Sequence, residues 1–262
     1  MTAIPNCLMI PCPRPTATRR LVVFPHAGGG ANFYRAWGER FGPDVEVWIV
    51  QYPGRESRMA EPFVSDLDEL VGEISAGLRA TGNGPGNTAL FGHSMGATIA
   101  YETALALAGG LPLDALFVSA RRAPGSGPVS EARARPRTDE EILAVLRQHG
   151  GTPMEIFDQP LARELFLPVL RNDYLLLDSY RPEVGRPLLD IPIIALSGRQ
   201  DSSVEAESVM GWGRFTTAEF HSHALDGGHF YLVPQVDRVV ELVRAHLRDY
   251  PLVGKASMRW NA

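Results

Sequence analysis

The amino-acid sequence predicts an α/β protein with a mostly parallel central sheet flanked by helices. Three observations lead to this prediction. Short apolar runs alternate along the chain with segments of helical periodicity, which is the pattern that parallel β-α-β units produce. The chain has 262 residues, a length that suits one large domain of this class. Hydrophobic residues make up 45% of it, which is enough for a substantial buried core.

Each strand is predicted from a short apolar run bounded by turn or polar residues. The predicted strands are residues 20–25, 45–52, 87–91, 114–120, 191–198 and 215–225. Helices are expected where apolar residues recur at helical spacing, and these segments are 65–80, 97–108, 138–149, 160–168, 169–178 and 235–248. Ser65 is expected to cap the first of these helices, because acidic residues follow it in the first turn.

One interval of the predicted sheet is too long for an ordinary crossover. It lies between strands 114–120 and 191–198 and opens on a Pro- and Gly-rich stretch. We expect a helical lid insertion at about residues 125–187, within a domain of residues 19–262 that follows an N-terminal arm of residues 1–18. Loops at the carboxyl ends of strands shape the sites of α/β sheets, which favours a lid over a surface elaboration unrelated to the site.

The composition argues against several classes of function. The formal net charge of −5 argues against a nucleic-acid partner, because such binding is driven by positive charge. Neither a signal peptide nor a run approaching the ~20 apolar residues of a membrane helix is visible, so we expect a soluble cytoplasmic protein without a membrane partner. Cys7 and Cys12 have no His or Cys neighbour at zinc-ligand spacing, and we expect no metal.

The pentapeptide Gly92-His93-Ser94-Met95-Gly96 carries the main functional signal of the chain. It reads G-x-S-x-G, with a predicted strand before it and a predicted helix after it. Such a tight strand-to-helix turn holds its serine in strained backbone and exposes the hydroxyl above the sheet. The motif also arises by chance in loops, but the two flanks favour a hydrolase-type sheet with Ser94 as nucleophile.

A serine nucleophile needs a histidine base and an acid that orients the base. His229 is the expected base, because it follows the last predicted strand in a loop with two glycines. Asp201 is the expected acid, since it comes after strand 191–198, whereas strand 114–120 is followed by no carboxylate. Asp226 is the alternative, but its place three residues before His229 favours a turn. Four further histidines are not expected to be catalytic. His149 and His246 lie in predicted helices and are expected on the surface, whereas His221 and His223 alternate along the last predicted strand and are expected to be structural.

Two backbone amides are expected to stabilise the anion that forms when the serine attacks. One is the N–H of Met95, directly after the nucleophile. The other is the N–H of Ala27, in the Gly-rich loop that follows strand 20–25. The hypothesis that this Gly-rich loop binds a dinucleotide or a phosphate is not supported, because it has neither G-x-G-x-x-G spacing nor a Walker lysine.

Beyond these residues, the chain resembles the stand-alone type II thioesterases of polyketide and non-ribosomal peptide synthases, which have the α/β-hydrolase fold. The resemblance spans roughly residues 20–245. It rests on Phe24-Pro25-His26-Ala27-Gly28-Gly29, Gln51-Tyr52-Pro53-Gly54-Arg55, the Ser94 pentapeptide, Ser119-Ala120-Arg121-Arg122-Ala123-Pro124, Asp173-Tyr174, Ser179-Tyr180-Arg181-Pro182, Leu196-Ser197-Gly198-Arg199-Gln200-Asp201 and Gly227-Gly228-His229-Phe230-Tyr231.

This resemblance implies a thioesterase with Ser94 as nucleophile, His229 as base, Asp201 as orienting acid and the amides of Ala27 and Met95 as oxyanion hole. The implied substrate is an acyl thioester on the phosphopantetheine arm of an acyl or peptidyl carrier protein, hydrolysed to free a stalled synthase. The implied reaction uses no cofactor. The catalytic positions show no departure from the family pattern.

Several alternatives remain open at this point. The same three side chains serve an esterase of free small acyl esters or a macrocyclising thioesterase, and a non-catalytic hydrolase-fold binding protein is a third alternative. A basic cluster could steer docking of an acidic carrier protein, although a solvated charged face explains it equally well. Its members are Arg121, Arg122, Arg133, Arg135 and Arg137.

Overall fold

The computed structural model describes residues 4–82, 87–126, 134–183 and 185–249 of the chain. Arg133 of the basic cluster therefore lies outside the described residues, as do the first three residues of the arm and those after 249. None of the helices within the described ranges combines the length and the apolar character that a membrane span requires.

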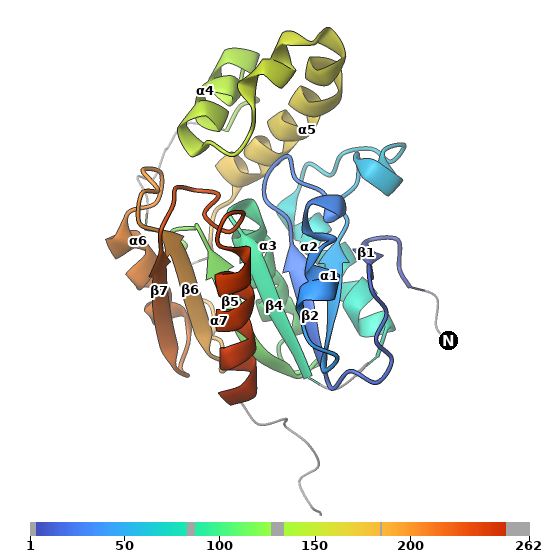
Figure 1. The fold of residues 1–262 in the computed structure, drawn as a ribbon, viewed down its shortest axis with the longest axis vertical. Coiled ribbons are helices and arrows are strands. Elements are labelled where there is room, and N and C mark those ends of the chain that lie inside the picture. Colours follow the sequence, from blue (N-terminus) through green and yellow to red (C-terminus); the bar gives the residue numbers. More distant parts are fainter. Residues whose placement is uncertain (1–3, 83–86, 127–133, 184, 250–262) are drawn as a thin grey trace, which may run out of the picture.

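A seven-stranded sheet forms the centre of the molecule, with strand order β1-β3-β2-β4-β5-β6-β7 (Figure 1). Only β1 runs antiparallel to its neighbour, and every other pair of neighbouring strands is parallel. The sequence prediction of a mostly parallel sheet is confirmed. The strands are β1 (Leu8–Met9), β2 (Arg19–Phe24), β3 (Val45–Val50), β4 (Asn87–His93), β5 (Leu113–Ser119), β6 (Ile193–Gly198) and β7 (Phe220–Leu225).

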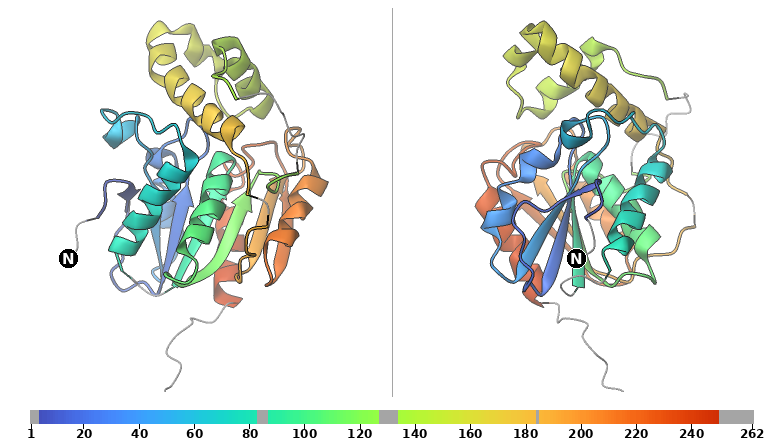
Figure 2. Two further views of the ribbon diagram at one scale, coloured as in Figure 1. Left: turned by 180° about the vertical axis from the view of Figure 1, so that it is seen from behind. Right: turned by 90° about the vertical axis from the view of Figure 1, so that its right-hand side faces the viewer.

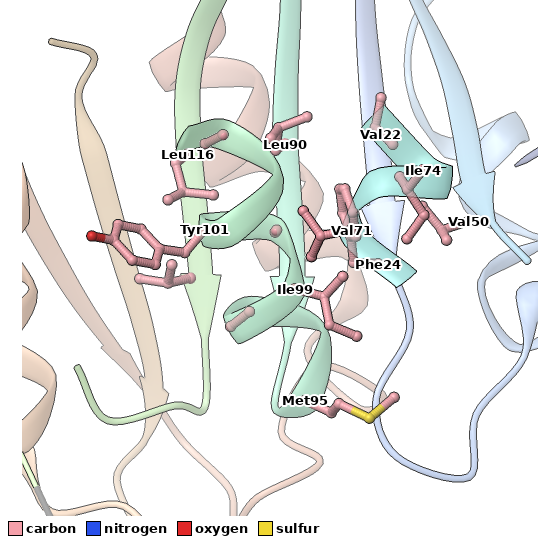
Figure 3. Packing of buried hydrophobic residues seen from close by; sticks show 14 of the residues in the cluster. Val22, Phe24, Val50, Val71, Ile74, Leu90, Met95, Ile99, Tyr101 and Leu116 are labelled. Atoms are coloured by element: carbon pink, nitrogen blue, oxygen red, sulfur yellow. The ribbon is translucent and has the colours of Figure 1, made fainter. Parts of the chain in front are cut away.

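Helices cover both faces of this sheet, as the edge-on view in Figure 2 shows. On one face, α2 (Leu67–Ala80) and α3 (Met95–Leu107) pack against the central strands, and Ile74 and Ile99 are fully buried there (Figure 3). On the other face, α7 contributes Val239 and Val243 to a second apolar layer. Burial on both faces explains why apolar residues follow one another without alternation over residues 21–24 of β2, 47–50 of β3 and 89–91 of β4. The helices outside the insertion are α1 (Trp37–Arg40), α2 (Leu67–Ala80), α3 (Met95–Leu107), α6 (Ala206–Met210) and α7 (Val236–Asp249), and short 3-10 turns are η1 (Ala31–Tyr34), η2 (Glu56–Arg58) and η4 (Gly211–Phe215).

The N-cap of α2 differs from the sequence expectation by one residue. Asp66, and not Ser65, caps the helix, because its carboxylate accepts hydrogen bonds from the N–H groups of Asp68 (2.7 Å) and Glu69 (3.2 Å). A carboxylate at this position also faces the positive end of the helix dipole.

The long interval between β5 and β6 folds into a helical insertion. It contains α4 (Asp139–His149), η3 (Met154–Asp158) and α5 (Pro160–Ser179). The two helices predicted at 160–168 and 169–178 are one helix, with Pro168 in its interior. Proline in a helix removes one backbone hydrogen bond, and here burial of the residues around it keeps the helix continuous.

This insertion has an apolar core of its own, formed between α4 and α5 and including Ile142, Leu146 and Leu170. Figure 1 shows both helices beyond one end of the sheet. That end is where the parallel strands finish, because Gly28, which follows β2, contacts Asp173 of α5. The insertion therefore covers the edge where sites form in α/β sheets.

The segment before β2 also packs on the sheet. Leu8 and Met9 of β1 pair with Val50 and Ile49 of β3, and the side chains of Cys7 and Leu8 are buried in the core. A strand of two residues carries no recognisable alternation, so the sequence pattern gave no sign of it.

Candidate active site

Ser94 lies between the last residue of β4 and the first residue of α3, in a left-handed backbone conformation with φ 54°. Both flanking glycines are required by close packing. A Cβ at Gly92 would lie 2.2 Å from the carbonyl oxygen of Gly96, and a Cβ at Gly96 would lie 2.0 Å from that of Phe24. The turn therefore holds its serine in a strained backbone, as the G-x-S-x-G pattern predicts.

Three side chains from separate strand ends meet at this turn. The Nε2 atom of His229 lies 3.0 Å from Oγ of Ser94, and its Nδ1 atom lies 2.8 Å from Oδ2 of Asp201. Asp201 follows β6 and His229 follows β7, so the sheet brings the predicted residues together. The side chains of His229 and Asp201 are only 4% and 2% exposed. This chain of two hydrogen bonds suits transfer of the serine proton to an imidazole.

Ser203 is a further contact of this group that the sequence analysis missed. Its backbone N–H and its hydroxyl donate to Oδ1 of Asp201 at 2.9 Å and 2.6 Å, and the hydroxyl lies 3.2 Å from Nδ1 of His229. Burial opposes ionisation of Asp201, but the hydrogen bonds of His229 and Ser203 outweigh it and lower the pKa of the carboxyl. The spacing of Asp201 and Ser203 could have predicted this contact, because an aspartate side chain often accepts a hydrogen bond from the backbone N–H two residues later.

The alternative acid, Asp226, does not reach the imidazole. Its carboxylate is exposed and pairs with Arg199 at 3.2 Å. Its position therefore agrees with the turn-forming role that the sequence favoured.

The sequence analysis expects His149 on the surface, whereas the structure shows a half-buried ring in contact with the base. His149 is the last residue of α4, and its ring stacks on that of His229 with centroids 4.0 Å apart and planes 17° apart. Burial is the largest cause that lowers the pKa of His149 to about 4, and electrostatic repulsion between its protonated ring and the nearby His229 and Arg137 adds to it. Asp201 acts in the opposite direction. Helical periodicity places His149 on a helix but does not reveal that the helix ends over the site.

Two further imidazoles are buried beneath the triad. Nδ1 of His93 lies 2.8 Å from Oγ of Ser119, and Nδ1 of His26 lies 3.1 Å from the hydroxyl of Tyr34. Burial is the largest cause that lowers the pKa of both rings, to about 3 for His26 and well below the usual value for His93. Both are therefore neutral, and neither points its bonded nitrogen at Ser94.

The two expected oxyanion donors lie on neighbouring segments, one at the start of α3 and one in the loop after β2. Met95 is the first residue of α3, where helix geometry leaves the N–H without an intrahelical partner. The loop of Ala27 begins beside this turn, since a Cβ at Gly96 would lie 2.7 Å from the carbonyl oxygen of Pro25. Among the described residues no acceptor is found for the Ala27 N–H. Both amides are thus available to an anion.

The described arginines of the basic cluster are engaged within the chain. Each donates a hydrogen bond to a nearby side chain or carbonyl, so their charges are not directed solely at solvent. The pairs are Arg121 with Thr98, Arg122 with the Ser203 carbonyl, Arg135 with Glu141 and Arg137 with Asp178. These contacts favour a structural use of the cluster over steering.

A parallel sheet with this strand order, a serine at a strand-to-helix turn and an inserted pair of helices define an α/β hydrolase. Within that class, residues 19–247 match the family model of the thioesterase domain, and the chain belongs to the thioesterase family. The expectation that it is a thioesterase enzyme is confirmed.

Similar proteins come from biosynthetic clusters and synthetases. Thioesterase PikA5 of Streptomyces venezuelae is 36% identical over 239 residues, which cover 90% of this chain and 83% of PikA5. The type II thioesterase BorB from the borrelidin biosynthetic cluster superimposes with a TM-score of 0.81 at 37% identity, covering 92% of this chain and 97% of BorB. AMB antimetabolite synthetase AmbE of Pseudomonas aeruginosa is 37% identical over 230 residues, which are 87% of this chain and 11% of AmbE.

Proposed function

We propose that this thioesterase removes acyl groups from the phosphopantetheine arm of an acyl or peptidyl carrier protein and so frees stalled synthases. The observation that carries the proposal is the chain of hydrogen bonds from Ser94 through His229 to Asp201. The likeness to BorB, a type II thioesterase of a biosynthetic cluster, supports the carrier-bound substrate.

In the first half of the proposed reaction, Ser94 attacks the thioester carbonyl. His229 takes the hydroxyl proton at Nε2, while Asp201 holds Nδ1 and offsets the charge of the imidazolium. The new Oγ–carbon bond places negative charge on the carbonyl oxygen, which the amides of Ala27 and Met95 stabilise. The carbon–sulfur bond then breaks, and the departing pantetheine sulfur receives the proton from His229.

In the second half, water hydrolyses the acyl-serine. His229 removes a proton from the water as its oxygen attacks the ester carbonyl, and the same two amides bind the second oxyanion. The ester bond to Oγ breaks, and His229 returns the proton to Ser94. Acid is released and the serine is restored, so the steps need neither a metal nor an organic cofactor.

We also propose that the helical insertion at about residues 125–187 is a lid over this site. Its support is the contact of α4 with the base, through His149, and of α5 with the loop after β2, through Asp173. We further propose a domain of residues 19–262 after an arm of residues 1–18, of which Leu8 and Met9 add strand β1 to the sheet of the domain. We place the reaction in the cytoplasm, where the free thiols of Cys7 and Cys12 would stay reduced.

Turnover of a panel of acyl-loaded carrier proteins tests the proposal. Ser94→Ala should abolish hydrolysis while leaving the melting temperature close to that of the wild type. Ser202→Ala is the matched control, because this exposed serine lies beside Asp201 and outside the hydrogen-bond chain. Undiminished hydrolysis by Ser94→Ala refutes the proposed mechanism.

A second comparison separates carrier editing from the hydrolysis of free esters. The value of kcat/KM for an acyl carrier thioester should exceed that for a p-nitrophenyl ester of the same acyl group. The opposite order refutes the editing role and favours an esterase. Failure of a fluorophosphonate to label Ser94 favours a binding protein instead.

A further inference from the structure

The loop of residues 25–29, here called the oxyanion loop, is held by side chains from two distant segments. At its start, the hydroxyl of Tyr52 donates to the carbonyl of Pro25 at 3.1 Å. At its end, Nη1 of Arg55 donates to the carbonyl of Gly29 at 3.2 Å. Between them, the N–H of Gly28 donates to Oδ2 of Asp173 at 2.8 Å.

Arg55 and Asp173 also bind each other in a two-pronged ion pair. Nη1 and Nη2 of the guanidinium lie 2.6 Å and 2.7 Å from Oδ2 and Oδ1 of the carboxylate. The side chains are 8% and 1% exposed. Burial opposes the charge of Arg55, but the charge and hydrogen bonds of Asp173 outweigh it and raise the pKa of the guanidinium. Because apolar residues often replace such pairs without loss of stability, fold stability alone is a weak reason for this pair.

Two amides of the oxyanion loop have acceptors within the protein, and one of these acceptors belongs to the ion pair. The N–H of Gly28 is bound by Asp173, and that of Gly29 donates to the carbonyl of His26 at 2.9 Å. The N–H of Ala27, the expected oxyanion donor, has no acceptor within the described residues. Gly28 has φ 77° and packs so tightly that a Cβ there would lie 2.5 Å from Leu170 of α5. The backbone directly after Ala27 is therefore packed against α5.

We propose that Arg55 and Asp173 are positioning residues that aim the Ala27 amide at the oxyanion. This inference rests on the proposed function, in which that amide is one of two oxyanion donors. It gives a role to Gln51-Tyr52-Pro53-Gly54-Arg55 and to Asp173, which the proton-transfer steps leave unused. Neither residue touches the reacting atoms; each acts through the backbone of the oxyanion loop.

A paired substitution tests this role without leaving a lone buried charge. Arg55→Met with Asp173→Leu removes the ion pair and its bonds to Gly28 and Gly29. The kcat for an acyl thioester should fall about 10- to 100-fold with little change in KM, since misplacing one donor weakens only the transition state. The affinity for a linear alkylboronic acid, whose tetrahedral serine adduct places an oxygen in the same hole, should fall by a similar factor.

The matched control is the same paired substitution at Arg19 and Asp114. This pair is also buried, with Nη1 and Oδ2 2.8 Å apart, but it joins the amino ends of β2 and β5, away from the site. Arg19→Met with Asp114→Leu should change the melting temperature and leave both kcat and the boronic acid affinity unchanged.

The outcomes separate this inference from the proposed function. A folded Arg55/Asp173 variant with wild-type kcat and boronic acid affinity overturns the inference, as does an equal loss in the Arg19/Asp114 control. If the double variant does not fold, Arg55→Lys is measured by the same criteria, because lysine keeps the charge but loses the two-pronged contact. Turnover that survives Ser94→Ala would instead refute the proposed function itself.

Discussion

The surroundings of His149 disfavour the protonated form of its ring, so the free energy of unfolding should decrease at acid pH. His149→Phe should remove this decrease. Burial first, and then electrostatic repulsion from the nearby His229 and Arg137, lower the pKa of His149 from 6.5 to about 4 in the folded protein. The unfolded chain therefore takes up this proton first. Between the two pKa values the unfolded state binds more protons, so stability falls as the pH falls. Phenylalanine keeps a ring on His229 and cannot titrate.

The size of the effect follows from the two pKa values. At about 1.4 kcal/mol per pKa unit, the difference corresponds to a loss of about 3 kcal/mol once the pH is below 4. Between pH 7 and pH 5, the wild type should lose about 2 kcal/mol more than His149→Phe. His26 and His93 are buried and neutral in both proteins, so their contributions cancel in the comparison.

Urea denaturation at pH 7, 6 and 5 measures this difference. Hydrogen exchange along α4 adds a local readout, since protonation of His149 should increase opening of that helix in the wild type and not in the variant. Parallel pH profiles of the two proteins, in unfolding free energy and in exchange, would contradict the half-buried position of His149 against the base.

Two further predictions concern the support of the triad and the nucleophile turn. Ser203→Ala removes a hydroxyl hydrogen bond to the charged carboxylate of Asp201. Such a bond is worth about 1.5 kcal/mol, so kcat should fall about 10-fold. Steady-state kinetics measure this change, and an unchanged kcat contradicts the prediction. Gly96→Ala should prevent folding or yield insoluble protein, because its Cβ would lie 2.0 Å from the carbonyl oxygen of Phe24. Gly72→Ala is the control in α2, where a Cβ meets nothing within 4 Å, and it should stabilise the protein by about 0.5–1 kcal/mol in thermal melts. A soluble, stable Gly96→Ala protein would contradict the packing of the turn.

The sheet was predictable because its signals are local. Residues 21–24 and 115–118, within the predicted strands 20–25 and 114–120, are buried on both faces of the sheet and so form continuous apolar segments. The contact of Ser94, His229 and Asp201 was also within reach, because all three follow strands whose carboxyl ends share one edge of the sheet. Their catalytic role stays a proposal.

The features that the sequence did not reveal depend on packing between distant segments. His149 reaches the base only because α4 packs on α5 and ends over the sheet. The continuity of α5 through Pro168 depends on the apolar core of the insertion, which outweighs a local helix-breaking preference. The contact of Arg55 with Asp173 joins residues 118 positions apart, and no local pattern reports such a pairing.

The ion pair of Arg55 and Asp173 also limits how parts of this enzyme can be exchanged with those of its relatives. Arg55 belongs to the sheet domain and Asp173 to the inserted helices. A chimaera that combines the inserted helices of one protein with the sheet of another receives the two partners from different parents. The buried charges balance in the chimaera only where both parent proteins have arginine at position 55 and aspartate at position 173. Recombination that aims to change acyl preference should therefore carry residues 51–55 together with α5.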